Sequence, residues 1–343
     1  MIKAVFKYLP ILILSSVIFS SCAKETIYKR TDAAMGTIWE IEIISTDKKN
    51  ADKAADEVFD EVKRLDKMLS LHNKESELSA LNARAGTGPV KVSQDIINIL
   101  KVAFKVSELT KGGFDISIGP VVKLWGFAGG NEYIPSGAEI KAAHELVGYK
   151  MISFDEKKSE ATLAKKGMVL DFGGIGKGYA VDRAASILKK YGIKNVMFSA
   201  GGQILIMGHN PKGGSWKVGV RHPRGDGMLT AVEDTERCIA TSGDYEHYFV
   251  KKNKLYHHIF DPQSSKPASD AVSCTVLLKT NTFDMPNTWA DALSKIGFVM
   301  HPEAAIKVIN EIKGAECVIA SDSPEGLRIA VSDNLKGKLE FNK

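Results

Sequence analysis

The sequence predicts an α+β fold in which mixed, mostly antiparallel sheets are flanked by helices. Apolar residues make up 44% and charged residues 25% of the 343-residue chain, a composition typical of globular proteins. Segments that alternate apolar and polar residues and segments with helical periodicity are both present. The two kinds are interspersed without a regular strand–helix alternation, which favours antiparallel pairing over a parallel sheet.

Helices are predicted where apolar residues recur at steps of three and four. The strongest pattern covers residues 51–69, and a second covers 93–109. A third covers 136–147, where Ser136 and Glu139 are placed to form a capping box. The remaining predicted helices are 179–191, 288–298 and 302–312.

Strands are predicted where apolar and polar residues alternate or where a short apolar run is bounded by turn residues. Residues 35–44 alternate most clearly, with isoleucines and glutamates at successive positions. The other predicted strands are 151–154, 168–170, 195–199, 204–207, 216–220, 238–241, 245–250, 273–279, 317–320 and 327–331.

The segment from Leu170 to Asp182, LDFGGIGKGYAVD, gives the strongest indication of function. Asp171 ends an apolar run, four glycines follow within six residues, and Lys177 lies among them before a helical pattern begins. Because glycine permits unusual dihedral angles and close approach, the backbone N–H groups of such a turn can contact an anion. The helix start and the lysine add positive charge. The segment therefore predicts a phosphate or diphosphate site, with packing alone as the alternative.

Three familiar motifs do not account for this turn. A P-loop has Ser or Thr after its Gly-Lys pair, whereas Gly178 follows here. The glycine spacing also differs from the dinucleotide fingerprint. Residues 171–173 read Asp-Phe-Gly, as in a kinase metal loop, but no His-Arg-Asp sequence precedes them. A nucleotide site at this turn is therefore of another kind.

The N-terminus predicts export and a lipid anchor. Residues 1–21 combine a basic start, an apolar core and small residues at the end, the features of a secretory signal peptide. The apolar core is too short for a stable membrane-spanning helix. Cys22 follows small residues as at a bacterial lipoprotein cleavage site, with an uncleaved anchor or ordinary secretion as the alternatives. Residues 22–34 are then the expected tether and 35–340 the expected folded domain.

Charge and cysteine content exclude several classes of function. The net charge is +5, and the lysines are scattered among acids, so no nucleic-acid partner is expected. No C-x-x-C pair occurs, so neither a zinc site nor a disulfide framework is indicated. A single disulfide remains open, but we expect Cys238, Cys274 and Cys317 to be buried small apolar residues.

Three further segments hold candidate site residues. Phe114, among the glycines of the loop at residues 112–120, stacks on a planar ligand or packs in the core. His258 is one of two neighbouring histidines, which point to opposite faces of a strand, and it is a candidate base. Asp291 lies early in an apolar helix, where it caps the helix or, with Asp171 and backbone carbonyls, holds Mg²⁺.

Taken in order, these motifs resemble those of the FAD:protein FMN transferase (ApbE) family. Each matching piece is short, but together they cover nearly the whole mature chain in the family's order. The matching segments are 34–37, 69–70, 79–82, 114–120, 124–127, 171–182, 199–202, 240–243, 258–262 and 290–292.

The resemblance implies an ApbE-like, T-fold-like fold and a magnesium-dependent enzyme. Such an enzyme cleaves the diphosphate of FAD and attaches FMN to Thr or Ser of a partner flavoprotein, releasing AMP. It also implies a periplasmic lipoprotein, tethered to a bacterial membrane through Cys22, that serves an extracytoplasmic electron-transfer system. An FAD pyrophosphatase and a non-catalytic flavin-binding lipoprotein are the alternatives.

The resemblance further implies roles for individual residues. Three are candidate catalytic residues, and the sequence does not choose among them as the base: His258, Asp291 and Asp171. The implied FAD-binding residues are Met35, His72, Gly113, Phe114, Asp115, Asp171, Lys177 and Phe260. The implied magnesium ligands are Asp291, the carbonyl of Gly174 and the side chain of Ser294.

Two residues depart from the family pattern. His72 stands where many of these transferases carry a tyrosine that covers the flavin ring, which leaves the balance of transfer over hydrolysis open. Lys295 stands where the family's magnesium helix usually has threonine, four residues after the aspartate. An ammonium group there repels a divalent cation or partly substitutes for it, so we expect metal binding to be weaker or differently ligated.

Overall fold

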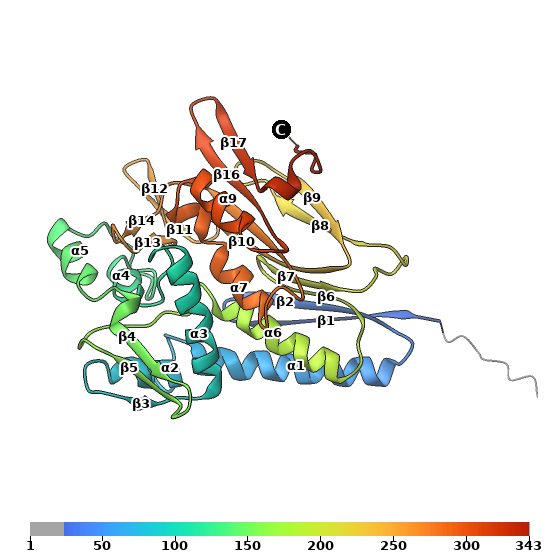
Figure 1. Cartoon of the computed structure of the whole chain (residues 1–343), viewed down its shortest axis with the longest axis horizontal. Coiled ribbons are helices and arrows are strands. Elements are labelled where there is room, and N and C mark those ends of the chain that lie inside the picture. The colour runs from blue at the N-terminus through green and yellow to red at the C-terminus, as the bar shows by residue number, and fades with distance from the viewer. Residues whose placement is uncertain (1–23, 343) are drawn as a thin grey trace, which may run out of the picture.

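The computed structural model describes residues 24–342 (Figure 1). The predicted signal peptide (residues 1–21) and Cys22 lie outside the described residues. Within the described part, no helix combines the length and apolar character needed to cross a membrane. Cys238, Cys274 and Cys317 are buried free thiols, as the sequence predicted.

An eight-stranded sheet forms the centre of the molecule, and every neighbouring pair in it is antiparallel. This confirms the predicted α+β class with antiparallel pairing. In spatial order the strands are β1 (Thr26–Ala34), β2 (Thr37–Ser45), β6 (Asn195–Ala200), β7 (Gln203–Met207), β10 (Glu236–Gly243), β15 (Ser273–Lys279), β16 (Ala315–Ser323) and β17 (Gly326–Val331).

Different elements pack on the two faces of this sheet (Figure 1). Helices pack on one face and enclose the main core, and α1 and α6 run side by side there. These helices are α1 (Lys48–Leu69), α3 (Gln94–Leu109), α6 (Gly176–Lys190) and α7 (Pro286–Leu293). The hairpin of β8 (Trp216–Arg221) and β9 (Met228–Asp234) covers part of the other face and forms a second core. Because β15 is buried from Ser273 to Leu278, its sequence is continuously apolar or small rather than alternating.

Smaller elements gather at one end of the sheet. A three-stranded sheet and two short hairpins lie there, together with an aromatic cluster. The strands are β3 (Val90–Lys91), β4 (Ile152–Asp155), β5 (Glu160–Leu163), β11 (Tyr248–Lys251), β12 (Lys254–His257), β13 (Phe260–Asp261) and β14 (Lys266–Pro267). The helices there are α2 (Glu77–Ala83), α4 (Gly119–Leu124), α5 (Gly137–His144) and α8 (Ile296–Val299), with a single 3₁₀ turn at Tyr149–Met151. Helix α9 (Pro302–Asn310) packs instead on β16 and β17, and a second 3₁₀ turn, Asp333–Leu335, contacts β16.

Two predicted segments differ from the structure. Most of the expected tether, residues 26–34, is strand β1, which pairs with β2 along its whole length. It is a largely exposed edge strand with polar residues on both faces, so its composition resembles that of a linker. The expected strand at 168–170 makes only an isolated bridge between Val169 and Ile118. Its backbone bonds instead to the side chain of Asn82, which both donates to and accepts from Leu170.

The predicted helices begin and end within a few residues of the observed ones, and two of the differences have a clear cause. Helix α6 begins at Gly176 rather than at residue 179, because its glycines hide the start of the helical pattern. The predicted helix 288–298 is divided into α7 and α8 at Ser294, whose hydroxyl bonds to the carbonyl of Asp291 at 2.7 Å.

Candidate active site

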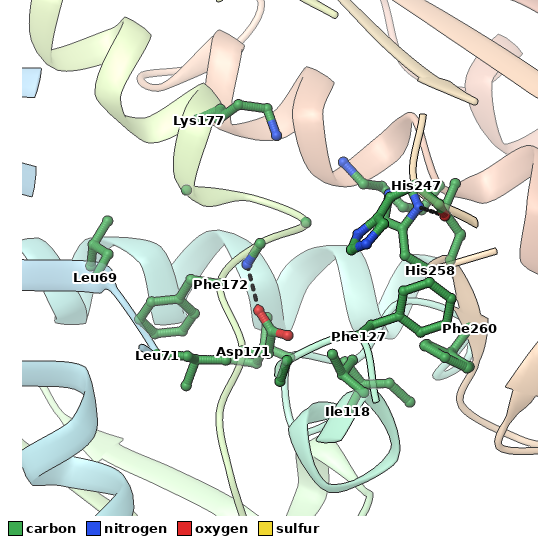
Figure 2. Close-up of a pocket in the computed structure, with 18 of the residues that line it drawn as sticks. Leu69, Leu71, Ile118, Phe127, Asp171, Phe172, Lys177, His247, His258 and Phe260 are labelled. Carbon is green, nitrogen blue, oxygen red and sulfur yellow. Dashed lines mark hydrogen bonds between the residues drawn. The ribbon is translucent and has the colours of Figure 1, made fainter. Parts of the chain in front are cut away.

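A cavity of about 500 Å³ opens between the start of α6, the loop after α1, the loop before α4 and the β12–β13 segment. Figure 2 shows side chains from these segments directed toward one another around it. The cavity is lined by all eight residues that the sequence assigned to FAD: Met35, His72, Gly113, Phe114, Asp115, Asp171, Lys177 and Phe260. Its size is within the usual range for small-molecule sites.

The glycine turn presents unpaired backbone donors at this cavity. The N–H groups of Gly174 and Lys177 donate to no acceptor within the described residues. Both residues line the cavity, at the N-terminal end of α6, where the helix carries partial positive charge. The Lys177 side chain extends from the first turn of α6 toward the same space (Figure 2). This end of the cavity is therefore suited to an anion.

Packing accounts for a different glycine of the same turn. A Cβ on Gly178 would lie 2.2 Å from the carbonyl oxygen of Asn287, so only glycine lets α6 approach α7 this closely. The Gly178 N–H donates to Asp291 at 2.8 Å across that contact. The structure thus shows the packing role at Gly178, while Gly174 lines the cavity, where an anion site stays a prediction.

Asp171 stands at the base of the turn. One of its carboxylate oxygens, Oδ1, accepts the N–H of Gly173 at 2.7 Å, while no donor in residues 24–342 reaches Oδ2. Burial raises the pKa of Asp171, although Gly173, His72 and Lys177 act in the opposite direction. A half-buried carboxylate with a free oxygen and a raised pKa can exchange a proton with a ligand in the cavity.

Asp291 lies behind the cavity rather than on its wall. Both of its carboxylate oxygens have protein partners, because Gly178 donates to Oδ2 and the Lys295 ammonium lies 2.5 Å from Oδ1. Burial acts to raise the pKa of Asp291, but the charges of Lys295 and Lys177 outweigh it and hold that pKa below its usual value. Asp291 is therefore a buried, ionised counter-ion.

The residues implied as magnesium ligands do not fit a divalent ion. Lys295 donates to Oδ1 and to the carbonyl of Asp291, and its ammonium lies 3.3 Å from the hydroxyl of Ser294. That hydroxyl also bonds to Ser242 at 2.7 Å and is buried, away from the cavity. Two of the three implied ligands, the Asp291 carboxylate and the Ser294 hydroxyl, thus have the Lys295 ammonium beside them.

His258 faces the cavity, whereas the neighbouring His257 is buried against Phe298, which confirms that the two rings point to opposite faces. The Nδ1 of His258 donates to the carbonyl oxygen of His247 at 3.0 Å, so its proton is on Nδ1 and Nε2 is left as an acceptor. Burial lowers the pKa of His258 to about 3, which keeps the ring neutral.

Aromatic side chains form the wall beyond His258. Phe260 is buried against Trp125 and Phe127, with ring centroids 5.8 and 5.7 Å away. Phe127 also lies on the cavity and contacts His247 edge-on at 5.0 Å. This apolar wall is suited to planar ring systems, at the opposite end from Lys177 (Figure 2).

Two other assigned residues shape the wall through the backbone. Met35 and Gly36 form the β1–β2 turn with φ of 48° and 71°, a geometry that brings Met35 to the cavity. The Asp115 carboxylate accepts hydrogen bonds from the N–H and hydroxyl of Ser117 and from the N–H of Tyr149. Burial raises the pKa of Asp115, and the carboxyl group fastens the loop before α4.

Sequence reasoning missed His247 and Phe127 as cavity residues. The antiparallel pairing of Tyr248 with His257 places His247 opposite His258, and the two rings lie 5.8 Å apart. A hairpin register drawn through residues 248–257 would have found this pair. Phe127 was noted only as part of a family motif, since nothing local shows that it reaches the β11–β12 hairpin.

Fold and cavity together define a class of protein whose cavity has a basic end suited to an anion and an aromatic wall suited to planar rings. A family model described as the ApbE family matches residues 35–319. The chain therefore belongs to the ApbE family.

Individual relatives agree with this membership. An FAD:protein FMN transferase of Vibrio cholerae is 31% identical over 255 residues, covering 72% of this chain and 75% of that protein. A structure of the ApbE protein of Thermotoga maritima is similar at a TM-score of 0.81 and 34% identity, covering 91% of this chain and 98% of that one. The apo Pseudomonas stutzeri flavinyl transferase ApbE gives a TM-score of 0.80 at 27% identity, over 91% and 96% of the two chains.

Proposed function

We propose that this protein is an FAD:protein FMN transferase. A Thr or Ser hydroxyl oxygen of an acceptor protein attacks the FMN phosphorus, and the bond from that phosphorus to the bridging oxygen breaks. AMP leaves with the electron pair, and the hydroxyl proton passes to a base. The names of the curated relatives support this reaction. The observation that carries it is a cavity with unpaired N–H donors and Lys177 at one end and aromatic rings at the other.

The two ends of the cavity divide the work of holding FAD. The N–H groups of Gly174 and Lys177, with the Lys177 ammonium, hold and neutralise the diphosphate. Phe260 and Phe127 provide the apolar wall for a ring system. Since phosphoryl transfer depends mainly on positioning and charge stabilisation, these groups supply most of what the reaction needs from the protein.

His258 and Asp171 are the candidate bases that have free acceptor atoms. Nε2 of His258 and Oδ2 of Asp171 both belong to cavity residues, whereas Asp291 has both oxygens engaged. A neutral imidazole orients the hydroxyl by accepting its hydrogen bond, and Asp171, whose pKa is raised, receives the proton more readily. We propose Asp291 as the counter-ion of Lys295 instead of a base.

Magnesium dependence is the part of the family expectation that these residues support least. The implied ligand Asp291 is paired with Lys295, and Ser294 is turned away from the cavity. No step of the proposed reaction is therefore assigned to a metal.

We also propose that the enzyme is lipid-anchored through Cys22 on the extracytoplasmic side of a bacterial membrane. The support is the signal-peptide pattern of residues 1–21 and the small residues before Cys22. Its acceptor would then be a flavoprotein of an extracytoplasmic electron-transfer system. Mass spectrometry of the mature N-terminal peptide tests the anchor, since an unmodified Cys22 would contradict it.

Two measurements test the transferase function. Purified protein incubated with FAD should release AMP, which chromatography detects. A candidate acceptor flavoprotein co-expressed with it should gain the mass of FMN less one water. AMP and free FMN without a modified acceptor would instead indicate the FAD pyrophosphatase. This alternative is motivated by His72, which lines the cavity where many of these transferases carry a tyrosine. FAD binding without AMP release would indicate a flavin-binding protein without turnover.

A further inference from the structure

Lys295 lines the cavity, and its positive charge is incompatible with the magnesium ion that the family resemblance implies beside Asp291. Its ammonium lies 2.5 Å from Asp291 Oδ1, 2.7 Å from the Asp291 carbonyl and 3.3 Å from the Ser294 hydroxyl. An ammonium group has three N–H donors, and here three oxygens surround it. The ammonium group is thus surrounded by oxygens, the ligand type that a hard divalent cation prefers, and two of them belong to the implied ligands Asp291 and Ser294.

Resting on the proposed function, we propose that the Lys295 ammonium is a built-in cation that replaces a divalent metal ion in diphosphate cleavage. Lys295 lines the cavity, and its side chain is 17% exposed compared with 5% for Asp291. Its Cε lies 3.5 Å from the position that a Cβ on Gly174 would occupy, so its stem packs against the anion-binding turn. The ammonium therefore lies between a buried carboxylate behind it and the diphosphate site in front.

The surrounding charges oppose a second cation at the same place. Asp291 supplies a single negative charge, and its other oxygen already accepts the Gly178 N–H. Lys177 and Lys295 both line the cavity, and a divalent ion beside Asp291 would meet both ammonium groups. The Lys177 ammonium and that of Lys295, which is more exposed than its counter-ion Asp291, can instead stabilise the charge of a diphosphate without a metal being recruited.

Metal binding by the purified protein is the first test, and it requires no turnover. The protein is stripped with EDTA, freed of chelator and titrated with Mn²⁺, and binding is measured as loss of the electron paramagnetic resonance signal of free Mn²⁺. Wild-type protein should bind no Mn²⁺ in the absence of FAD, whereas Lys295→Thr should gain one bound ion at Asp291. Lys307→Thr is the matched control, because Lys307 is an exposed residue of α9 outside the cavity and this variant should behave as wild type.

AMP release from FAD is then measured in EDTA and in Mg²⁺. Wild-type release should be the same in both, and Lys295→Thr should lose about 100-fold in EDTA and recover in Mg²⁺. Because Lys295→Thr leaves the buried Asp291 without its ion-pair partner, its thermal unfolding is followed with and without Mn²⁺. The ion should raise the transition temperature of this variant only.

Each result separates the two proposals. Wild-type release that stops in EDTA and returns with Mg²⁺ would overturn the role of Lys295 while leaving the transferase function intact. Stoichiometric Mn²⁺ binding by wild type would overturn it equally, even if Lys295→Thr failed to fold. No AMP release in either condition would overturn the transferase function itself, and the role of Lys295 with it.

Discussion

The two ends of the cavity are built in opposite ways. At the α6 end, polar and charged groups are fixed by named partners: Asp291 by Gly178 and Lys295, and Asp171 by Gly173. At the other end, the uncharged rings of Phe260, Phe127 and Trp125 pack against one another. The difference indicates that the first end performs charge chemistry with preorganised groups, while the second supplies binding surface.

This comparison predicts different kinetic signatures for the two ends. Changes at the α6 end should lower kcat, because they remove charge stabilisation used in the transition state. Changes at the aromatic end should raise KM for FAD with kcat nearly unchanged, because they remove binding that ground state and transition state share.

The largest effect is expected for Asp291→Ala. The substitution leaves the Lys295 ammonium without its counter-ion, so AMP release should be lost. The free energy of unfolding should fall by about 3–5 kcal/mol, the usual result of breaking a buried ion pair. Urea unfolding and AMP release measure the two effects. Asp226→Ala, at an exposed loop acid, is the control and should change neither; full activity of Asp291→Ala would remove this residue from the site.

His258→Gln should lower kcat by about 100-fold or more if the imidazole accepts the hydroxyl proton or orients it. Glutamine can still reach the His247 carbonyl, but it cannot act as a base. His301→Gln, an exposed residue that does not line the cavity, serves as the control. A kcat within a few-fold of wild type would leave Asp171 as the base.

The same variant tests a pH effect on stability. Burial lowers the pKa of His258 to about 3 from its usual 6.5. Between pH 6.5 and 3, His258 is therefore protonated in the unfolded chain but neutral in the folded protein. This contribution to stability is therefore complete above pH 6.5 and is lost as pH falls toward 3. His258→Gln should show a shallower loss of unfolding free energy over that range, measured by urea titrations at successive pH values.

Phe260→Ala tests the aromatic end. It truncates a buried ring in contact with Trp125 and Phe127, so stability should fall by about 3–5 kcal/mol. KM for FAD should rise while kcat at saturating FAD stays near the wild-type value. Phe341→Ala, at a residue 36% exposed, is the control. A large fall in kcat would show that the aromatic end also positions the reacting atoms.

The smallest effect is expected for Gly178→Ala. The new Cβ would lie 2.2 Å from the Asn287 carbonyl oxygen, so α6 must shift away from α7. Overpacking of this kind costs about 1–3 kcal/mol, which thermal unfolding measures. Gly137→Ala is the control, because no atom lies within 4 Å of the position that its new methyl group would occupy and helix propensity improves. An unchanged transition temperature would show that the contact between the two helices yields easily.

Long amphipathic helices and central strands could be predicted because the local sequence records their burial, as helical periodicity in α1 and as an uninterrupted run of apolar or small residues in β15. Helix α1 and strand β15 were placed within a few residues for this reason. Edge strand β1 could not be, because its stability comes from pairing with β2 and its own residues are mostly exposed. The prediction of a strand at 168–170 was wrong because the local sequence is apolar like a strand, but the side chain of the distant Asn82 forms the hydrogen bonds of the Leu170 backbone.

The sequence by itself determined the α+β class and the glycine turn with Lys177, because both are recognisable from residue type and order. Through the family resemblance it also indicated eight of the residues that line the cavity, although it missed His247 and Phe127. Only the tertiary structure decided what those residues contact. It paired Asp291 with Lys295, turned Ser294 toward Ser242, and set His247 beside His258. Contacts of this kind depend on side-chain direction or join residues from separate elements. The local sequence therefore does not show which partner a buried side chain contacts.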